Sequence, residues 1–164
     1  MIALDPERLF DELGRAKVDY VLVGGFAVSA HGSIRATKDV DICPNPEEGN
    51  LRRLAKLLSD LQATVVDIGE LQDEHDVEPD LDGLQGGGNF RLMTRLGGLD
   101  VMQYLKPFED ETWVQLSKGA EEIRLGQRTL RVCSYVDLLE MKQAAGRNQD
   151  LVDIRNLKAN RAEL

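Results

Sequence analysis

Two aspartates placed two residues apart in an apolar segment are the residues of this sequence best suited to chemistry. Asp39 and Asp41 alternate with Val40 and Ile42. If the segment is a β-strand, alternate side chains share a face, so the two carboxylates lie together, roughly 5–7 Å apart, while the apolar pair enters the core. Carboxylates on one face repel each other, and a divalent cation relieves that repulsion. Their hard oxygen donors favour Mg²⁺ or Mn²⁺, which also bind substrate phosphates.

A third carboxylate, Asp100, stands in a second apolar segment between Leu99 and Val101. If this segment is a strand beside that of Asp39 and Asp41, the three carboxylates converge, enough to hold two metal ions about 3.5–4 Å apart. Such a pair of ions supports in-line displacement at phosphorus, with an activated hydroxyl attacking and pyrophosphate leaving. The alternative is that these aspartates simply face solvent on an edge strand or hairpin.

A glycine pair supplies the second part of a candidate site. Gly24 and Gly25 follow the apolar run 20–23 and precede a segment typical of a short helix. Glycine lets the backbone approach a phosphate closely, and the first turn of a helix offers unpaired N–H donors. Thirteen residues separate Gly25 from Asp39, enough for one helix and a return into a neighbouring strand. The pair is not a dinucleotide fingerprint, and the glycines at 86–88 are not a P-loop because no Lys-Ser/Thr follows.

The elements that position these residues follow from the apolar periodicity and the turn residues. We expect helices over 5–17, 26–32 and 47–62, strands over 18–25, 38–44 and 63–69, hairpins over 89–105 and 121–133, and helices over 134–146 and 150–164. The first hairpin is expected to turn at Leu96-Gly97-Gly98 and the second at Gly126-Gln127.

This order of elements indicates an α+β fold with a mixed or antiparallel β-sheet flanked by helices and a short C-terminal helical hairpin. Residues 1–133 are expected to form the core and 134–164 the C-terminal helical segment. The stretch 67–82 has eight acidic residues and no Lys or Arg, and glycine-rich sequence follows it. It is predicted to be a mobile, solvated loop.

Composition narrows the class of protein. The 164 residues suit one domain, and 42% hydrophobic with 30% charged residues is ordinary for a globular chain. No run of 18 apolar residues and no secretory signal is present, so a cytoplasmic protein without membrane contact is expected. The net charge of −9 disfavours nonspecific nucleic-acid binding but leaves a local basic patch open. The two cysteines and two histidines are isolated, so spacing predicts no zinc site or disulfide framework.

The residues around the glycine pair and the aspartates resemble a known superfamily. Leu22-Val23-Gly24-Gly25, His31-Gly32 and Arg35-Ala36-Thr37-Lys38-Asp39-Val40-Asp41 are similar to the polymerase-β-like nucleotidyltransferases, and most similar to small bacterial members related to AbiEii-type abortive-infection toxins. Asp100 matches the later single aspartate of that pattern. The segment 142–147 with Asp150 and Asp153 resembles the closing helical motif, so the resemblance spans roughly residues 18–157.

Two departures from the superfamily pattern are visible. Many members have Ser where this chain has Gly25, which removes a side-chain contact to phosphate. Larger relatives also add a helical C-terminal domain that grips the acceptor. This chain is shorter, so a partner or a second subunit is a candidate to complete the acceptor site.

The resemblance implies a metal-dependent transfer of a nucleoside monophosphate from an NTP to a hydroxyl of an RNA end, a protein or a small molecule. Asp39, Asp41 and Asp100 would be the catalytic residues and the ligands of Mg²⁺ or Mn²⁺. The residues implied to bind the nucleotide are Gly24, Gly25, Arg35, Thr37 and Lys142. A toxin role with a cognate antitoxin is implied too, and the alternative is a catalytically inactive nucleotide-binding or antitoxin-like partner protein.

Four residues of the pattern also have simpler interpretations. His31 suits packing or capping at a helix end better than a role as a base. Arg35 is either a phosphate contact or a surface charge paired with Asp39. Lys142 and Arg147 either contact phosphate or acceptor, or form the solvated face of a helix near its C-terminal end, where cations are favourable.

Overall fold

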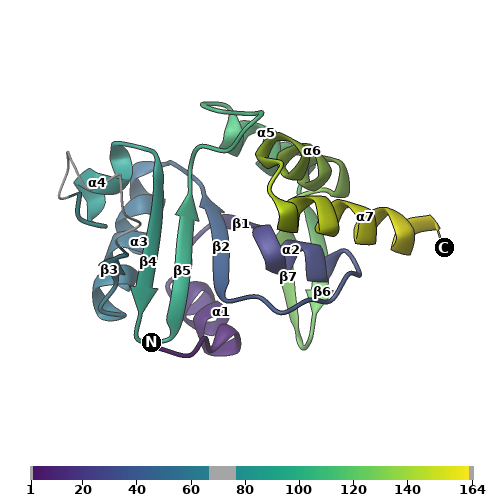
Figure 1. The fold of residues 1–164 in the computed structure, drawn as a ribbon. Helices are drawn as coiled ribbons and strands as arrows, with labels where there is room; N and C mark the ends of the chain where they lie inside the picture. The colour runs from purple at the N-terminus through teal and green to yellow at the C-terminus, as the bar shows by residue number, and fades with distance from the viewer. Residues whose placement is uncertain (1, 67–76, 163–164) are drawn as a thin grey trace.

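A mixed β-sheet organises the part of the chain that the computed structural model describes, residues 2–66 and 77–162 (Figure 1). Within those residues the sheet has seven strands in the order β3-β4-β5-β2-β1-β7-β6. The strands are β1 (Tyr20–Val23), β2 (Asp39–Pro44), β3 (Thr64–Val65), β4 (Asn89–Thr94), β5 (Gly97–Met102), β6 (Glu121–Leu125) and β7 (Arg128–Val132). The helices are α1 (Pro6–Arg15), α2 (Gly24–Ala30), α3 (Glu48–Asp60), α4 (Leu81–Gln85), α5 (Thr112–Gly119), α6 (Tyr135–Ala145) and α7 (Asn148–Ala162).

The register of the central strands decides which side chains meet. Strand β2 is antiparallel to β1 and parallel to β5, and Asp41 pairs with Asp100 across β2 and β5. Strand β4 is antiparallel to β5 and places Arg91 opposite Asp100. Paired residues of neighbouring strands share a face, so these three charged side chains form one row across the sheet.

Helices cover the two sides of the sheet unequally (Figure 1). Helices α1 and α3 bury apolar stripes on one side; Leu9 and Leu13 of α1 and Leu54 and Leu58 of α3 are fully buried. Helix α6 packs against α7 and α2 toward the β1–β7 side of the other face, and among the described residues no helix lies in front of β4 and β5 (Figure 1). Polar residues therefore remain accessible on that part of the sheet.

The structure confirms the α+β class, the mixed sheet and both hairpins. Side chains cap the N-termini of two helices: Asp5 accepts from the Arg8 N–H at 3.1 Å, and Ser134 accepts from the Asp137 N–H at 3.0 Å. Among the described helices, none has the length and apolar character that crossing a bilayer requires. The division of the chain near residue 133 stays a prediction.

Several local predictions were wrong. Residues 81–85 form helix α4 rather than loop, because Asp80 accepts from the Gly83 N–H at 2.9 Å and caps a single turn. Helix α5 was not predicted. The first hairpin turns at 95–96, and β5 begins at Gly97. Helix α2 begins at Gly24, two residues earlier than expected. The acidic residues 67–76, and with them most of the predicted loop and the end of the strand expected over 63–69, lie outside the described residues.

Candidate active site

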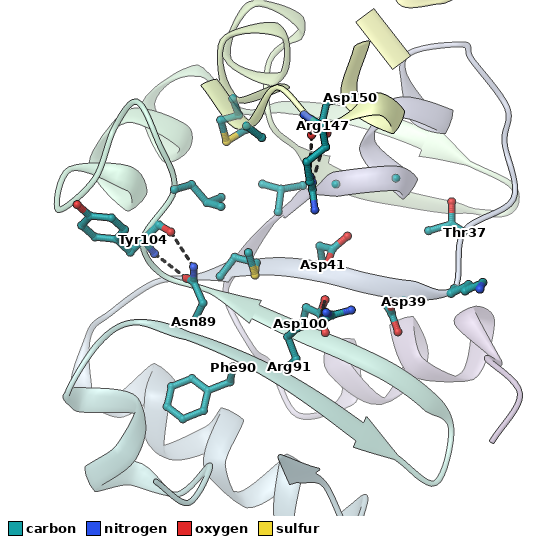
Figure 2. A pocket seen from close by; sticks show the side chains of 18 of the residues that line it. Thr37, Asp39, Asp41, Asn89, Phe90, Arg91, Asp100, Tyr104, Arg147 and Asp150 are labelled. Carbon is teal, nitrogen blue, oxygen red and sulfur yellow. Dashed lines mark hydrogen bonds and ion pairs between the residues drawn. The ribbon is translucent and has the colours of Figure 1, made fainter. Parts of the chain in front are cut away.

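The three aspartates lie on one face of two adjacent strands (Figure 2). Asp41 and Asp100 are direct partners across β2 and β5, and Asp39 lies one side-chain pair further along β2. Their strand neighbours Val40, Ile42, Leu99 and Val101 are fully buried on the opposite face. The alternation of apolar and acidic residues therefore does what the strand pattern predicted, and Asp100 shares the face of Asp39 and Asp41.

Two glycines make the space that the carboxylates occupy. A Cβ on Gly24 would lie 1.9 Å from Oδ2 of Asp41, and a Cβ on Gly98 would lie 1.8 Å from Oδ1 of Asp39. Both distances are far inside van der Waals contact, so neither position accepts a side chain while the aspartates stay in place. Gly24 also has φ +69°, a conformation that glycine adopts at little cost. Gly98 was not predicted, because its role depends on the pairing of β2 with β5.

Burial and mutual repulsion shift the acidities of this pair. Burial is the largest cause that raises the pKa of Asp100, to about 8, and the charges of Asp41 and Asp39 add to it. Burial also raises the pKa of Asp41, against the opposing effects of a hydrogen bond with Asp100 and the charge of Lys142. At neutral pH the pair Asp41–Asp100 therefore retains a proton, which is the state expected of two adjacent carboxylates without a compensating cation.

The carboxylates fit a divalent cation by the chemistry of their donors. Hard oxygen ligands on a rigid strand suit Mg²⁺ or Mn²⁺, and the spaces above Gly24 and Gly98 are already filled by carboxylate groups. Within the described part of the chain, however, no three His, Cys, Asp or Glu side chains stand in an arrangement that would already hold a metal ion. Instead, Nε of Arg91 lies 3.7 Å from Oδ2 of Asp100. The carboxylates would have to turn from this arrangement to share an ion.

The loop before β2 packs against the glycine pair. A Cβ on Gly25 would lie 2.7 Å from Cγ2 and 2.8 Å from Oγ1 of Thr37, and 3.0 Å from Nη2 of Arg35. Gly25 also hydrogen-bonds to Asp41 through its backbone. The structure thus brings Gly24, Gly25, Thr37 and Arg35 to the same edge of the cleft as the aspartates. Arg35 does not pair with Asp39 as one interpretation held; its Nε lies 3.0 Å from Oδ1 of Asp153.

Lys142 is buried rather than solvated. Only 6% of the residue is exposed, and its Nζ lies 2.9 Å from Oδ2 of Asp153 and 3.2 Å from Oδ1 of Asp150. The solvated-helix interpretation is therefore wrong for Lys142. It describes Arg147 better, whose side chain is 76% exposed although its Nε lies 2.7 Å from Oδ2 of Asp150.

Two buried acids hold this cationic cluster together. Asp150 and Asp153 are each 1% exposed, and both belong to α7. Burial by itself would raise the pKa of Asp150, but hydrogen bonds from Arg147 and Lys142 outweigh it and lower that pKa. Asp153 contacts both Arg35 and Lys142, so α7 is linked to the loop before β2 as well as to α6. Both acids stand in the motif at the end of the chain, but neither was predicted as a site residue.

One open cleft joins all these groups. It has a volume of about 1750 Å³ and is lined at one end by the glycine pair, the loop 35–38 and Lys142, and at the other by Asn89, Arg91, Met102 and Tyr104 (Figure 2). A pocket for one drug-sized ligand has roughly 300–1,000 Å³, so this cleft has room for two molecules side by side. The aspartates lie between its two ends.

The described histidine, His31, and the two cysteines have structural surroundings. Nε2 of His31 lies 2.8 Å from the carbonyl oxygen of Cys133, and its ring contacts Tyr135 edge-on at 6.0 Å between centroids. This is the packing role expected at the end of a helix. Cys43 and Cys133 are free and buried, and burial raises the pKa of each thiol to about 12.

No family model and no curated sequence matches the chain, whereas solved structures do. The lincosamide antibiotic adenylyltransferase LnuA, solved with lincomycin, is 18% identical with a TM-score of 0.64, over 95% of this chain and 98% of that one. ANT(2'')-Ia in complex with adenylyl-2''-tobramycin is 12% identical with a TM-score of 0.57, over 94% and 86%. An antigenic nucleotidyltransferase-like protein from Paracoccidioides brasiliensis is 18% identical with a TM-score of 0.54, over 94% and 75%.

These likenesses define the class of fold. The chain has the fold of the nucleotidyltransferases, as the sequence resemblance implied. The more specific likeness to AbiEii-type toxins stays a prediction.

Proposed function

We propose that the protein is a metal-dependent nucleotidyltransferase that moves a nucleoside monophosphate from an NTP to an acceptor hydroxyl. The observation that carries this proposal is the meeting of Asp39, Asp41 and Asp100 on one face of β2 and β5, next to the Gly24-Gly25 turn. The shared fold supports it. Burial raises the pKa of Asp41 and of Asp100, and groups with shifted pKa values cluster at functional sites.

Each acid has its own part in the reaction. Bound Mg²⁺ or Mn²⁺ would neutralise phosphate charge and lower the pKa of the attacking hydroxyl. Asp39 and Asp41 would hold the ions, and Asp100 would complete the second ion's ligands and accept the proton of the acceptor hydroxyl. The new bond joins the acceptor oxygen to the α-phosphorus as the bond from that phosphorus to pyrophosphate breaks.

The end of the cleft that the glycine pair, the loop 35–38 and Lys142 line suits the triphosphate. The backbone of Gly24 and Gly25, the hydroxyl of Thr37 and the guanidinium of Arg35 lie together there. Lys142 donates one hydrogen bond to Asp150 and forms an ion pair with Asp153. Because an ammonium group has three N–H donors, Lys142 retains a donor for a phosphate oxygen in the cleft.

A small-molecule acceptor is one of the three classes that the resemblance left open, and the solved structures favour it. LnuA was solved with lincomycin and ANT(2'')-Ia with a nucleotidylated tobramycin. By this likeness the acceptor here would also be a small hydroxyl compound. The toxin role and a cognate antitoxin stay predictions, and retention of all three carboxylates argues against the catalytically inactive alternative.

The test is transfer of label from an α-³²P-labelled NTP, with Mg²⁺ or Mn²⁺, to a cell extract. We expect labelled acceptor and one pyrophosphate per transfer, and a loss of roughly 10³-fold or more in the Asp41→Asn variant, because a metal ligand is removed. Asp60→Asn is the matched control; Asp60 is 58% exposed on α3, pairs with Lys56 and lies outside the cleft. Equal labelling by Asp41→Asn would refute the metal mechanism, and absence of NTP binding in Mg²⁺ would favour the inactive alternative.

A further inference from the structure

Among the described residues, no helix covers the sheet surface next to the carboxylates, and this surface joins the cleft (Figure 1). We call it the open face; its side chains share one side of β3, β4 and β5 and come from Thr64, Val66, Asn89, Arg91, Met93 and Met102. Val66 extends β3 by one further backbone hydrogen bond, 2.8 Å from its N–H to the carbonyl oxygen of Arg91. Thr64, Val66, Asn89 and Arg91 are exposed, whereas Met93 and Met102 are half-buried. Asp100 borders this surface through its pairing with Arg91.

Three of the six side chains of the open face are apolar, and one carries a positive charge. Among all residues of β3, β4 and β5, Arg91 is the only cation, and its side chain is 52% exposed. It contacts Asp100 at 3.7 Å, longer than a hydrogen bond, so its guanidinium retains donors for a ligand. Around it, Val66, Met93 and Met102 present thioether and hydrocarbon surface, and flexible thioethers adapt to varied apolar shapes.

This surface does not suit a polynucleotide. Single-stranded nucleic acid is held by a row of cations along the phosphates and by exposed aromatic rings on which bases stack. The six side chains of the open face include one cation and no aromatic ring. The cleft beside them adds the exposed Tyr104 and Lys106, which is one ring and one charge rather than a row of either. The net charge of −9 adds a general repulsion of phosphates.

A polycation suits the open face no better. Ammonium groups placed on it would approach Arg91, and once metal ions bind the three aspartates the neighbouring negative charge is largely neutralised. A ligand with an apolar side and neutral oxygen atoms has neither problem. It can cover the methionines while Arg91 and Asn89 donate hydrogen bonds to its oxygens.

We propose that the acceptor is a small hydroxyl compound of low net charge with an apolar side, and that it lies on the open face with its reacting hydroxyl beside Asp100. This inference rests on the proposed function and names its substrate class. The cleft volume of about 1750 Å³ admits such a molecule together with the nucleotide. Arg91 then acts as a specificity-determining residue for the acceptor, separate from the groups around Lys142 that serve the triphosphate.

The first experiment separates failure of this inference from failure of the proposed function. The protein, Mg²⁺ and an α-³²P-labelled NTP are incubated with three fractions of one cell extract: molecules below about 1 kDa, total RNA and soluble protein. We expect label in the small-molecule fraction, on a product that an apolar column retains more strongly than the NTP. Label in RNA, in protein or on a polycationic small molecule would overturn the inference and leave nucleotidyl transfer standing. No label in any fraction would overturn both.

The second experiment tests Arg91 with the acceptor purified from the labelled fraction. Arg91→Met keeps the length of the side chain and removes its charge and donors. We expect the KM for the acceptor to rise about 10- to 100-fold, the loss expected for a charged hydrogen bond, with an unchanged KM for the NTP. Arg95→Met is the control, since Arg95 is exposed in the turn outside the cleft. An unchanged acceptor KM, or an equal rise in both KM values, would overturn the role of Arg91.

Discussion

A methyl group added at Gly98 gives a direct test of where the carboxylate of Asp39 must lie. In Gly98→Ala the new Cβ would stand 1.8 Å from Oδ1 of Asp39, whereas ordinary contact begins at 3.4 Å, so the carboxylate must move by about 1.6 Å. A displacement of about 1 Å at a reacting centre can cost about 10²-fold in rate. Overpacking of this kind typically costs about 1–3 kcal/mol of stability. We expect metal-dependent transfer to fall by 10²-fold or more in a protein that still folds, measured as initial rates of pyrophosphate release.

The controls for this variant are also set by the structure. In an Asp39→Ala background, Gly98→Ala meets no carboxylate, so the added methyl should no longer lower the free energy of unfolding measured in urea. Gly14→Ala in α1 is a neutral comparison, because a Cβ there meets nothing within 4 Å. Wild-type transfer rates in Gly98→Ala would refute the placement of Asp39 in the reaction.

Two further perturbations follow from the buried charges. The pKa of Asp100 is about 8 in the folded protein against an ordinary 3.8, so folding favours its protonated form. The contribution of Asp100 to stability is therefore full below about pH 4 and is lost as pH rises through about 8. Urea unfolding of the metal-free protein should show this decline in the free energy of unfolding. Asp100→Asn should show a smaller decline, because burial still raises the pKa of Asp41. A rise in stability over this range would contradict the reasoning. Lys142→Met leaves Asp150 and Asp153 buried with one cation fewer, and should lower the free energy of unfolding by about 3–5 kcal/mol; a loss below 1 kcal/mol in the same assay would show that water reaches these acids.

The central part of the fold could be predicted because local pattern and global position agree there. Val40 and Ile42 alternate with acids, and an alternating strand next to a diglycine turn has few other arrangements. The same alternation placed Asp100 on a strand with its neighbours inside. That it lies opposite Asp41 depended on the parallel pairing of β2 and β5, which only the resemblance could suggest.

The missed features depend on contacts distant in sequence. Gly98 makes room for Asp39, 59 residues away, and no local signal marks it. Asp153 and Lys142 look like ordinary charges on helices, and only the packing of α7 against α6 and the loop of Arg35 buries them. Helix α4 is a single capped turn inside an acid-rich segment and is too short to show a periodic pattern. The acidic composition therefore predicted a loop, although Asp80 is a suitable cap residue.

Under the proposed function, the contacts of Asp153 make helix α7 necessary for activity. Asp153 is the counter-charge of Arg35, in the loop before β2, and of Lys142, in α6. Asp150 is a second counter-charge of Lys142. A chain that ended after residue 147, or a protease that cut between α6 and α7, would retain all three aspartates and both glycines of the turn. It would nevertheless leave Arg35 and Lys142 without their counter-charges, free to repel each other or to pair with the three aspartates proposed to bind metal. Under the proposed function, removal of α7 would therefore abolish transfer without changing a group that contacts the reacting atoms.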